Sequence, residues 1–103
     1  MKKIPEVAII IVNYNQRGLL SSCIDSLEKI DYPNFETIIV DNGSKDGSVE
    51  YINGLRKSRI NGLRIKTVFN KENTGFAGGN NIALPLVKGE YILLLNNDSK
   101  VTP

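Results

Sequence analysis

Residues 7–13 read VAIIIVN, a run of aliphatic and mostly β-branched residues that ends in an asparagine. Because no polar residue alternates within it, a strand built from this run is covered on both faces, as in a parallel sheet flanked by helices. Three later runs are predicted to be strands of the same sheet: residues 37–40, 63–69 and 91–95. Arg64 and Lys66 alternate with apolar residues in the run at 63–69, which places that strand at an edge.

The segments between the strands show helical periodicity. Apolar residues recur at spacings of three and four within residues 19–30, 49–55 and 76–87. Asn15 is the expected N-cap of the first helix, and Asp46 or Ser48 that of the second. Tyr32-Pro33 is expected to end the first helix, and Pro85 to cost the third a hydrogen bond and kink it.

The predicted elements alternate as β-α-β-α-β-α-β. This order favours right-handed crossovers and a mostly parallel, four-stranded sheet flanked by helices, which is a Rossmann-like α/β fold. No linker or change of composition divides the chain, so residues 1–103 are expected to form a single domain.

The composition excludes several kinds of protein and site. Hydrophobic residues make up 41% of the chain and charged residues 23%, which is typical of a globular domain. The net charge of +2 is scattered along the chain, so no nucleic-acid partner is expected. The chain has no histidine, which excludes serine and cysteine triads and most zinc sites. Its single cysteine, Cys23, is predicted to be a small buried hydrophobic residue.

A polar cluster follows each predicted strand. The clusters are Asn13-Tyr14-Asn15, Asp41-Asn42-Gly43-Ser44, Asn70-Lys71-Glu72-Asn73 and Asn96-Asn97-Asp98-Ser99. In an open parallel sheet the carboxyl ends of the strands share one edge, and ligands bind in the crevice outside that edge. The sequence therefore predicts that these clusters converge on one candidate site.

Two interpretations of these clusters remain open. Polar loops and helix caps account for Asn15, Ser44 and Asp46 without any ligand. They account less well for Asp41 and Asp98, because a carboxylate close to an apolar strand is partly desolvated and needs a donor or a cation as partner. A functional role is favoured for these two carboxylates, whereas the asparagines fit either interpretation.

The loops also exclude some common nucleotide-binding motifs. A dinucleotide site needs G-x-G-x-x-G after the first strand, but residues 13–18 read NYNQRG. A P-loop is absent, and no acidic residue ends the first strand as a phosphoacceptor domain requires. Gly75, Gly78 and Gly79 lie before or within the third predicted helix, where they allow close approach of another group.

Four blocks of the sequence together resemble the successive motifs of family-2 glycosyltransferases with the GT-A fold. They are VAIIIVNYN at 7–15, IIVDNGSKDGS at 38–48, NTGFAGGNN at 73–81 and GEYILLLNND at 89–98. The blocks occur in the family's order and cover nearly the whole chain. The resemblance implies an inverting enzyme that transfers a sugar from a nucleoside-diphosphate donor to an acceptor hydroxyl.

The resemblance implies a donor-binding role for several residues after the strands. The loop after the first strand and Asp41 hold the base and ribose, and residues 73–80 line the nucleotide pocket. A carboxylate such as Asp41 can accept the imino N–H of uracil or thymine, so a UDP- or dTDP-sugar is the expected donor. The expected substrate-binding residues are Asn13, Tyr14, Asn15, Asp41, Asn42, Ser44, Asn73, Gly75, Asn80 and Asn97.

The resemblance also implies a metal site. Asp98 corresponds to the retained carboxylate of the family's Asp-x-Asp motif, whose oxygen ligands suit Mg²⁺ or Mn²⁺. Asn96 stands where the first Asp of the motif is expected, which puts the strength of metal binding in doubt. The stretch NNDS at 96–99 resembles the branch of the family that includes rhamnosyltransferases, which points to a dTDP-deoxysugar donor.

The family's catalytic base is an aspartate well after the Asp-x-Asp block, so no catalytic residue is expected within residues 1–103. We expect the chain to be the donor-binding part of a longer cytoplasmic enzyme, peripheral at the membrane, that binds a sugar or lipid-linked acceptor through its remaining part. The last strand, partly uncovered, is expected to favour self-association. A non-catalytic nucleotide-binding or interaction module with the same fold stays open as the alternative.

Overall fold

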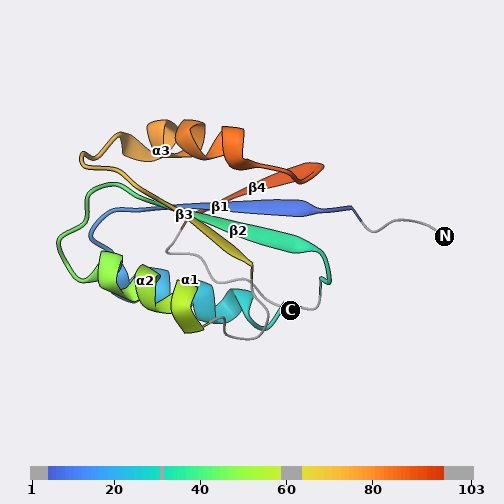
Figure 1. The fold of residues 1–103 in the computed structure, drawn as a ribbon, viewed down its shortest axis with the longest axis horizontal. Helices are drawn as coiled ribbons and strands as arrows, with labels where there is room; N and C mark the ends of the chain where they lie inside the picture. Colours follow the sequence, from blue (N-terminus) through green and yellow to red (C-terminus); the bar gives the residue numbers. More distant parts are fainter. Residues whose placement is uncertain (1–4, 31, 59–63, 97–103) are drawn as a thin grey trace.

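The computed structural model describes residues 5–30, 32–58 and 64–96, and Figure 1 shows their arrangement. Strands and helices alternate along the chain as the sequence predicts. In order they are β1 (Val7–Asn13), α1 (Arg17–Leu27), β2 (Phe35–Asp41), α2 (Ser48–Ser58), β3 (Ile65–Phe69), α3 (Gly75–Ala83), the 3₁₀ helix η2 (Leu84–Leu86) and β4 (Tyr91–Asn96).

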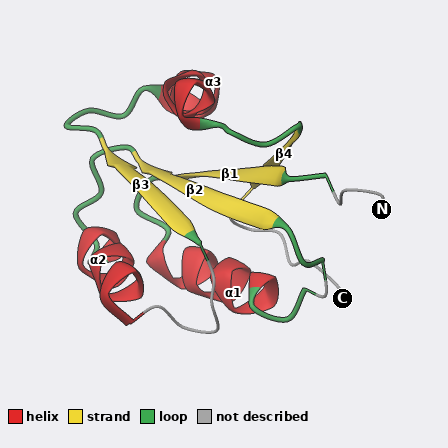
Figure 2. Cartoon of the chain, turned by 45° about the vertical axis from the view of Figure 1, so that its right-hand side comes forward, coloured by secondary structure: helices red, strands yellow, loops and turns green. Residues whose placement is uncertain are grey.

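The strands form one parallel sheet in the order β3-β2-β1-β4. Helices α1 and α2 cover one face of this sheet and α3 covers the other, as Figure 2 shows. The predicted parallel α/β fold with four strands is therefore confirmed. In the part of the chain that the structure describes, β3 pairs with β2 alone, so its predicted edge position is also confirmed.

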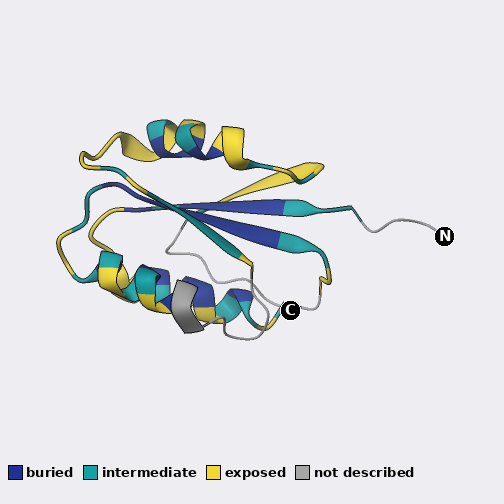
Figure 3. Cartoon of the chain, viewed as in Figure 1, coloured by how far each residue is buried: buried dark blue, intermediate teal, exposed yellow. Residues whose placement is uncertain are grey.

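The core has two layers because successive side chains of a strand point to opposite faces. Ile9, Ile11 and Ile39 pack against α1 and α2, whereas Ile10 and Ile38 pack on the face covered by α3. Both central strands are buried along most of their length (Figure 3). This two-sided burial explains why residues 7–12 show no polar alternation.

Two small residues, Cys23 and Gly79, pack in the core. Cys23 of α1 is fully buried in the core layer between this helix and the sheet, as predicted. A Cβ added to Gly79 of α3 would lie 2.7 Å from Cγ1 of Val12, so only glycine lets α3 approach β1 this closely. Gly79 thus has a packing role.

The last strand differs from β1 and β2. Its run of aliphatic residues predicts cover on both faces, but Tyr91, Ile92, Leu93 and Leu94 are 45–60% exposed. Among the described residues, β4 pairs only with β1, and of its apolar side chains Leu95 packs against the core. An apolar strand therefore lies open at one edge of the sheet.

Three predictions about helix ends are wrong. Asn15 is not the N-cap of α1: Gln16 occupies that position, without a side-chain capping bond. Helix α1 ends at Leu27, before it reaches Tyr32-Pro33. The third helix does not continue through a kink, because α3 ends at Ala83 and Pro85 lies in the separate 3₁₀ turn that follows.

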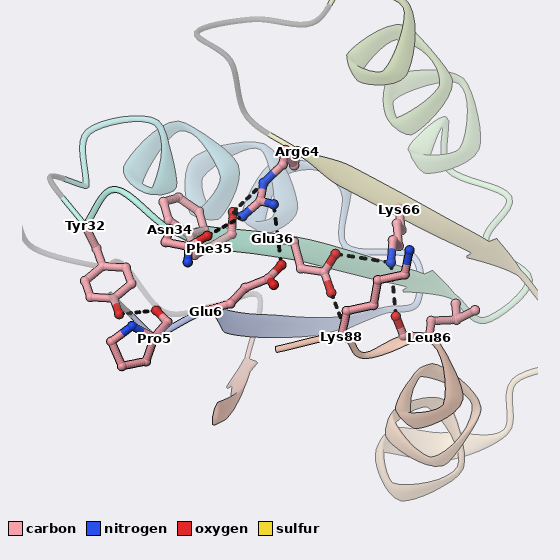
Figure 4. Close-up of polar contacts among 10 residues, drawn as sticks. All are labelled: Pro5, Glu6, Tyr32, Asn34, Phe35, Glu36, Arg64, Lys66, Leu86 and Lys88. Atoms are coloured by element: carbon pink, nitrogen blue, oxygen red, sulfur yellow. Dashed lines mark hydrogen bonds and ion pairs between the residues drawn. The ribbon is translucent and has the colours of Figure 1, made fainter. Parts of the chain in front are cut away.

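Polar contacts connect the segments at the amino-terminal ends of the strands, at the opposite end of the sheet from the loops that follow the strands (Figure 4). The buried Glu36 carboxylate lies 3.2 Å from Lys66 Nζ, and it accepts the Lys88 N–H at 3.3 Å. Lys66 Nζ also donates to the Leu86 carbonyl at 3.1 Å. Lys66 and Glu36 thereby hold the connection between α3 and β4 against the sheet.

A second group of contacts lies further along the same edge in Figure 4. Arg64 pairs with Glu6 at 3.4 Å and donates to the Phe35 carbonyl at 2.9 Å. The Tyr32 hydroxyl donates to the Pro5 carbonyl. The charged residues that mark β3 as an edge strand thus have structural partners within the fold.

Candidate functional site

The loops that follow β1, β2 and β3 lie together at one end of the sheet, the left-hand end of Figure 1. The strand register explains this, since Asn13 lies beside Asp41 and Asp41 beside Phe69. The carboxyl end of β4 reaches the same edge, where Asn96 pairs with Val12. We call this edge with its loops the rim.

The Asp41 carboxylate is the centre of the first half of the rim. Its Oδ1 accepts hydrogen bonds from Asn13 Nδ2 at 2.9 Å and from the Ser44 hydroxyl at 2.7 Å. Its Oδ2 accepts the Ser44 N–H at 2.9 Å. Asp41 is only 1% exposed and Asn13 is fully buried. The protein itself therefore supplies the partners that a desolvated carboxylate requires, and a carboxylate has about one further acceptor position.

Ser44 and Asn15 connect the loops after β1 and β2. The Ser44 hydroxyl accepts the Asn15 N–H at 2.9 Å, and Asn15 Oδ1 accepts the Lys45 N–H at 2.7 Å. Asn15 has a φ of 49°, in the left-handed region that asparagine tolerates better than most residues. Its side chain joins the two loops, which is why it does not cap α1.

Asp46 caps two helices at once. Its Oδ2 accepts the N–H of Arg17, the first residue of α1, at 2.9 Å. Its Oδ1 accepts the N–H and the hydroxyl of Ser48, the first residue of α2, at 3.1 and 2.6 Å. The Ser48 hydroxyl, together with both backbone donors, lowers the pKa of Asp46. The sequence predicts the contact to α2, but no local signal points to α1, which lies 29 residues away.

Asn42 is the centre of the second half of the rim. Its Oδ1 accepts from Asn70 Nδ2 and from the Thr74 hydroxyl, each at 2.9 Å. Its Nδ2 donates to the Gly75 carbonyl at 3.2 Å. Asn42 is 1% exposed. The sequence analysis places Asn70 in the cluster after the third strand and Thr74 in the segment expected to line the nucleotide pocket, but nothing in their spacing shows that they meet Asn42.

Two glycines of the rim have a left-handed backbone, and at Gly43 the absence of a side chain also lets the loops after β2 and β3 approach each other. Gly43 has a φ of +80°, and a Cβ added there would lie 2.8 Å from the Lys71 carbonyl oxygen. Gly75 has a φ of +76° with open space around it, and its N–H donates to Asn73 Oδ1 at 2.9 Å. Both positions need the left-handed backbone conformation that glycine adopts at low cost.

The remaining predicted residues differ in exposure. Tyr14 is 45% exposed at the end of β1, and Asn73 is also exposed. Asn80 is buried within α3, where its Nδ2 donates to the Phe76 carbonyl at 2.9 Å. The rim thus contains both buried polar side chains, such as Asp41 and Asn42, and exposed side chains, such as Tyr14 and Asn73.

The predicted metal site is not tested by this structure. Asn97 and Asp98 lie outside the described residues. Within residues 5–30, 32–58 and 64–96, no group of three or more His, Cys, Asp or Glu side chains is placed to hold a metal ion. None of the helices in these ranges has the length and apolar character needed to cross a membrane.

Comparison with known proteins gives several relatives. Poly(ribitol-phosphate) beta-glucosyltransferase of Bacillus spizizenii is 34% identical over 98 residues, which are 93% of this chain and 15% of that protein. The Escherichia coli enzyme WfaP, a UDP-Glc:alpha-D-GlcNAc-diphosphoundecaprenol beta-1,3-glucosyltransferase, is 38% identical over 89% of this chain and 35% of its own length. The chain therefore spans a minor part of these curated relatives.

Solved structures share the fold. The mannosyltransferase PcManGT from Pyrobaculum calidifontis, in complex with GDP-Man and Mn²⁺, superposes with a TM-score of 0.87 at 27% identity, over 95% of this chain and 29% of that one. S. aureus TarS 1–349 in complex with UDP-GlcNAc gives a TM-score of 0.83 at 27% identity, over 94% and 28% of the two chains.

The family model that matches the chain is described as glycosyl transferase family 2 and covers residues 8–103. This match includes the strands and helices from β1 to β4, apart from Val7 at the start of β1. The chain belongs to glycosyl transferase family 2.

Proposed function

We propose that this chain is the donor-binding part of an inverting glycosyltransferase that uses a UDP- or dTDP-linked sugar. The observation that carries the proposal is the rim, where buried Asn13, Asp41 and Asn42 hold the loops after β1, β2 and β3 in fixed positions. Solved structures of the same fold hold GDP-Man with Mn²⁺, UDP or UDP-GlcNAc, which supports a nucleotide sugar as ligand.

The base is assigned to the half of the rim around Asp41. The remaining acceptor position of its carboxylate accepts the imino N–H of uracil or thymine, which adenine and cytosine do not offer. Because Asp41 is only 1% exposed, we expect the loop around Tyr14 to shift slightly when the base enters. The exposed ring of Tyr14 then stacks on the base, a contact worth about 1–3 kcal/mol.

The diphosphate is assigned to a divalent cation, Mg²⁺ or Mn²⁺, held by Asp98 beside Asn97. The residue types fit a hard cation, since Asp98 and Asn97 carry carboxylate and amide oxygens and the chain has no histidine. A bound cation neutralises the negative charge of the departing diphosphate. The role of residues in the rim is then to hold the nucleoside, so that the sugar projects beyond the carboxyl edge.

The acceptor and the catalytic base are assigned to the rest of a longer protein. An inverting displacement needs a base that takes the proton of the attacking hydroxyl, which typically contributes 10²–10⁴-fold. Among the relatives, one acts on a poly(ribitol-phosphate) and another on a diphosphoundecaprenol-linked sugar. We propose a role in cell-wall or polysaccharide synthesis at the cytoplasmic side of a membrane, with a dTDP-deoxysugar as donor.

We also propose that the chain alone self-associates through β4. Its side chains Tyr91 to Leu94 are exposed on a strand whose second edge has no described neighbour. Exposed apolar strands of this kind favour pairing with another chain.

Calorimetry with this chain tests the donor-binding function. We expect weak binding of uridine and thymidine diphosphates that becomes stronger with Mn²⁺, and no sugar transfer. Asp98→Ala is expected to abolish the effect of Mn²⁺ while the nucleoside contacts remain. Binding that ignores the metal would contradict the role of Asp98. If a longer protein that contains this chain binds the nucleotide but transfers no sugar, the alternative of a non-catalytic nucleotide-binding module is favoured.

A further inference from the structure

Asn42 makes three hydrogen bonds within the protein that the proposed donor chemistry does not use. Its oxygen accepts from Asn70 and Thr74 at 2.9 Å, and its nitrogen donates to the Gly75 carbonyl at 3.2 Å. All these partners belong to the loop between β3 and α3 or to its junction with the helix. At 1% exposure, Asn42 offers almost no surface to a ligand.

The contacts of Asn42 require an amide. A carboxylate of the same shape has no N–H to donate, so one of its oxygens would face the Gly75 carbonyl oxygen and repel it. A methyl group would leave the partly buried donors of Asn70 and Thr74 without this acceptor. Neither replacement keeps all of the contacts.

These contacts also explain an irregular feature of α3. Thr74 is its N-cap residue but makes no side-chain capping bond. Its hydroxyl donates to Asn42 instead. A Cβ added to Gly78 would lie 2.9 Å from Thr74 Cβ, so the first turn of the helix packs closely around this side chain. Asn42, directly after β2, therefore holds the residue that precedes α3.

We propose that Asn42 is a positioning residue for donor binding. Its amide fixes the turn at residues 73–79 against the end of β2 and touches no part of the donor. Asp41 and Asn42 therefore hold different loops of the rim. Asp41 is hydrogen-bonded to residues of β1 and of the loop after β2, whereas Asn42 is hydrogen-bonded to the loop before α3. This inference rests on the proposed function, because it assumes that the nucleotide binds beside this turn.

The test compares Asn42→Asp and Asn42→Ala with the wild-type chain. Asn53→Asp on α2 is the matched control, since it makes the same change of charge at a half-buried position outside the rim. Calorimetry gives the dissociation constants for uridine and thymidine diphosphates. Amide NMR spectra give the signals of the Asn70 side chain and the Gly75 N–H. We expect about 10-fold weaker binding in both Asn42 variants, with the spectral changes confined to residues 70–79.

The outcomes separate this inference from the proposed function. Wild-type chain that binds neither nucleotide would contradict the donor-binding function itself. Wild-type binding with equal affinity in Asn42→Asp would overturn the positioning role alone. Weaker binding with unmoved Asn70 and Gly75 signals would also overturn it, because Asn42 would then act by direct contact. If the Asn42 variants do not fold, Thr74→Val removes a single contact, and about 3-fold weaker binding with a shifted Gly75 signal is expected.

Discussion

The close approach of the loops after β2 and β3 can be tested with three glycine-to-alanine substitutions. Gly54 lies in the middle of α2 with no atom near the position of a new Cβ. Gly75 has open space but a φ of +76°, and Gly43 combines a φ of +80° with a contact of 2.8 Å to a backbone oxygen. The series therefore separates helix propensity, backbone strain and steric clash.

The expected free energies of unfolding follow from these surroundings. Gly54→Ala should raise the stability by about 0.5–1 kcal/mol, because glycine is a poor helix former. Gly75→Ala should lower it by about 1 kcal/mol, since the left-handed conformation costs a residue with a Cβ about 1–2 kcal/mol and the unfolded chain loses some entropy. Gly43→Ala should lower it by about 3 kcal/mol, because displacement of the Lys71 backbone adds about 1–3 kcal/mol.

Urea denaturation followed by circular dichroism measures these differences by linear extrapolation. A loss of 3 kcal/mol is a large fraction of the roughly 5–15 kcal/mol that stabilises a small domain. If Gly43→Ala is no less stable than Gly75→Ala, the loops after β2 and β3 do not pack as described. The Gly54 variant is the control, because alanine there brings neither a left-handed backbone nor a steric clash.

Three other predictions concern the rim and the open strand. Asp46→Ala should lower the stability by about 1–2 kcal/mol at pH 7, because one carboxylate caps two helices. The Ser48 hydroxyl chiefly lowers the folded-state pKa of Asp46, so its stabilising contribution is present above the unfolded pKa near 3.8 and is lost as the pH falls through the folded value. In urea unfolding, the free energy of unfolding should therefore fall less between pH 7 and pH 3 in the variant than in the wild-type chain. Asp41→Asn should weaken binding of uridine or thymidine diphosphate by about 1–3 kcal/mol, and unchanged affinity in calorimetry would remove Asp41 from the base site. The chain should form dimers or larger species at millimolar concentration and Leu93→Lys should reduce them, whereas a monomer by light scattering would refute pairing through β4.

The two central strands were largely predictable because burial on both faces leaves a simple signature in the sequence. Residues 7–12 form β1 almost as expected, with Asn13 added at its end. Strand β2 begins two residues earlier than predicted, at Phe35, because Glu36 breaks the apolar run although it lies inside the sheet. Its charge is accommodated by Lys66, from a different strand, which a local pattern does not reveal.

The position of the candidate site was predictable, but its internal contacts were not. Strand ends identify Asn13, Asp41 and Asn42 as neighbours on one edge, since the register of a parallel sheet brings them together. The choice of partners depends on how loops about 30 residues apart meet, as in the bond from Asn15 to Ser44. The metal ligand Asp98 stays a prediction, as it lies outside the described residues.

Asp41 is the last residue of β2 and Asn42 follows it directly, and their side chains lie on opposite faces of the sheet. Asp41 meets Asn13 and Ser44 on the side of α1 and α2, and Asn42 meets Thr74 on the side of α3. Because strand residues alternate with a period of two, deletion of one residue within β2 would send each side chain to the wrong loop. The length of β2 is therefore more constrained than its composition: one aliphatic residue can replace another there, but an insertion or a deletion would dismantle both halves of the rim.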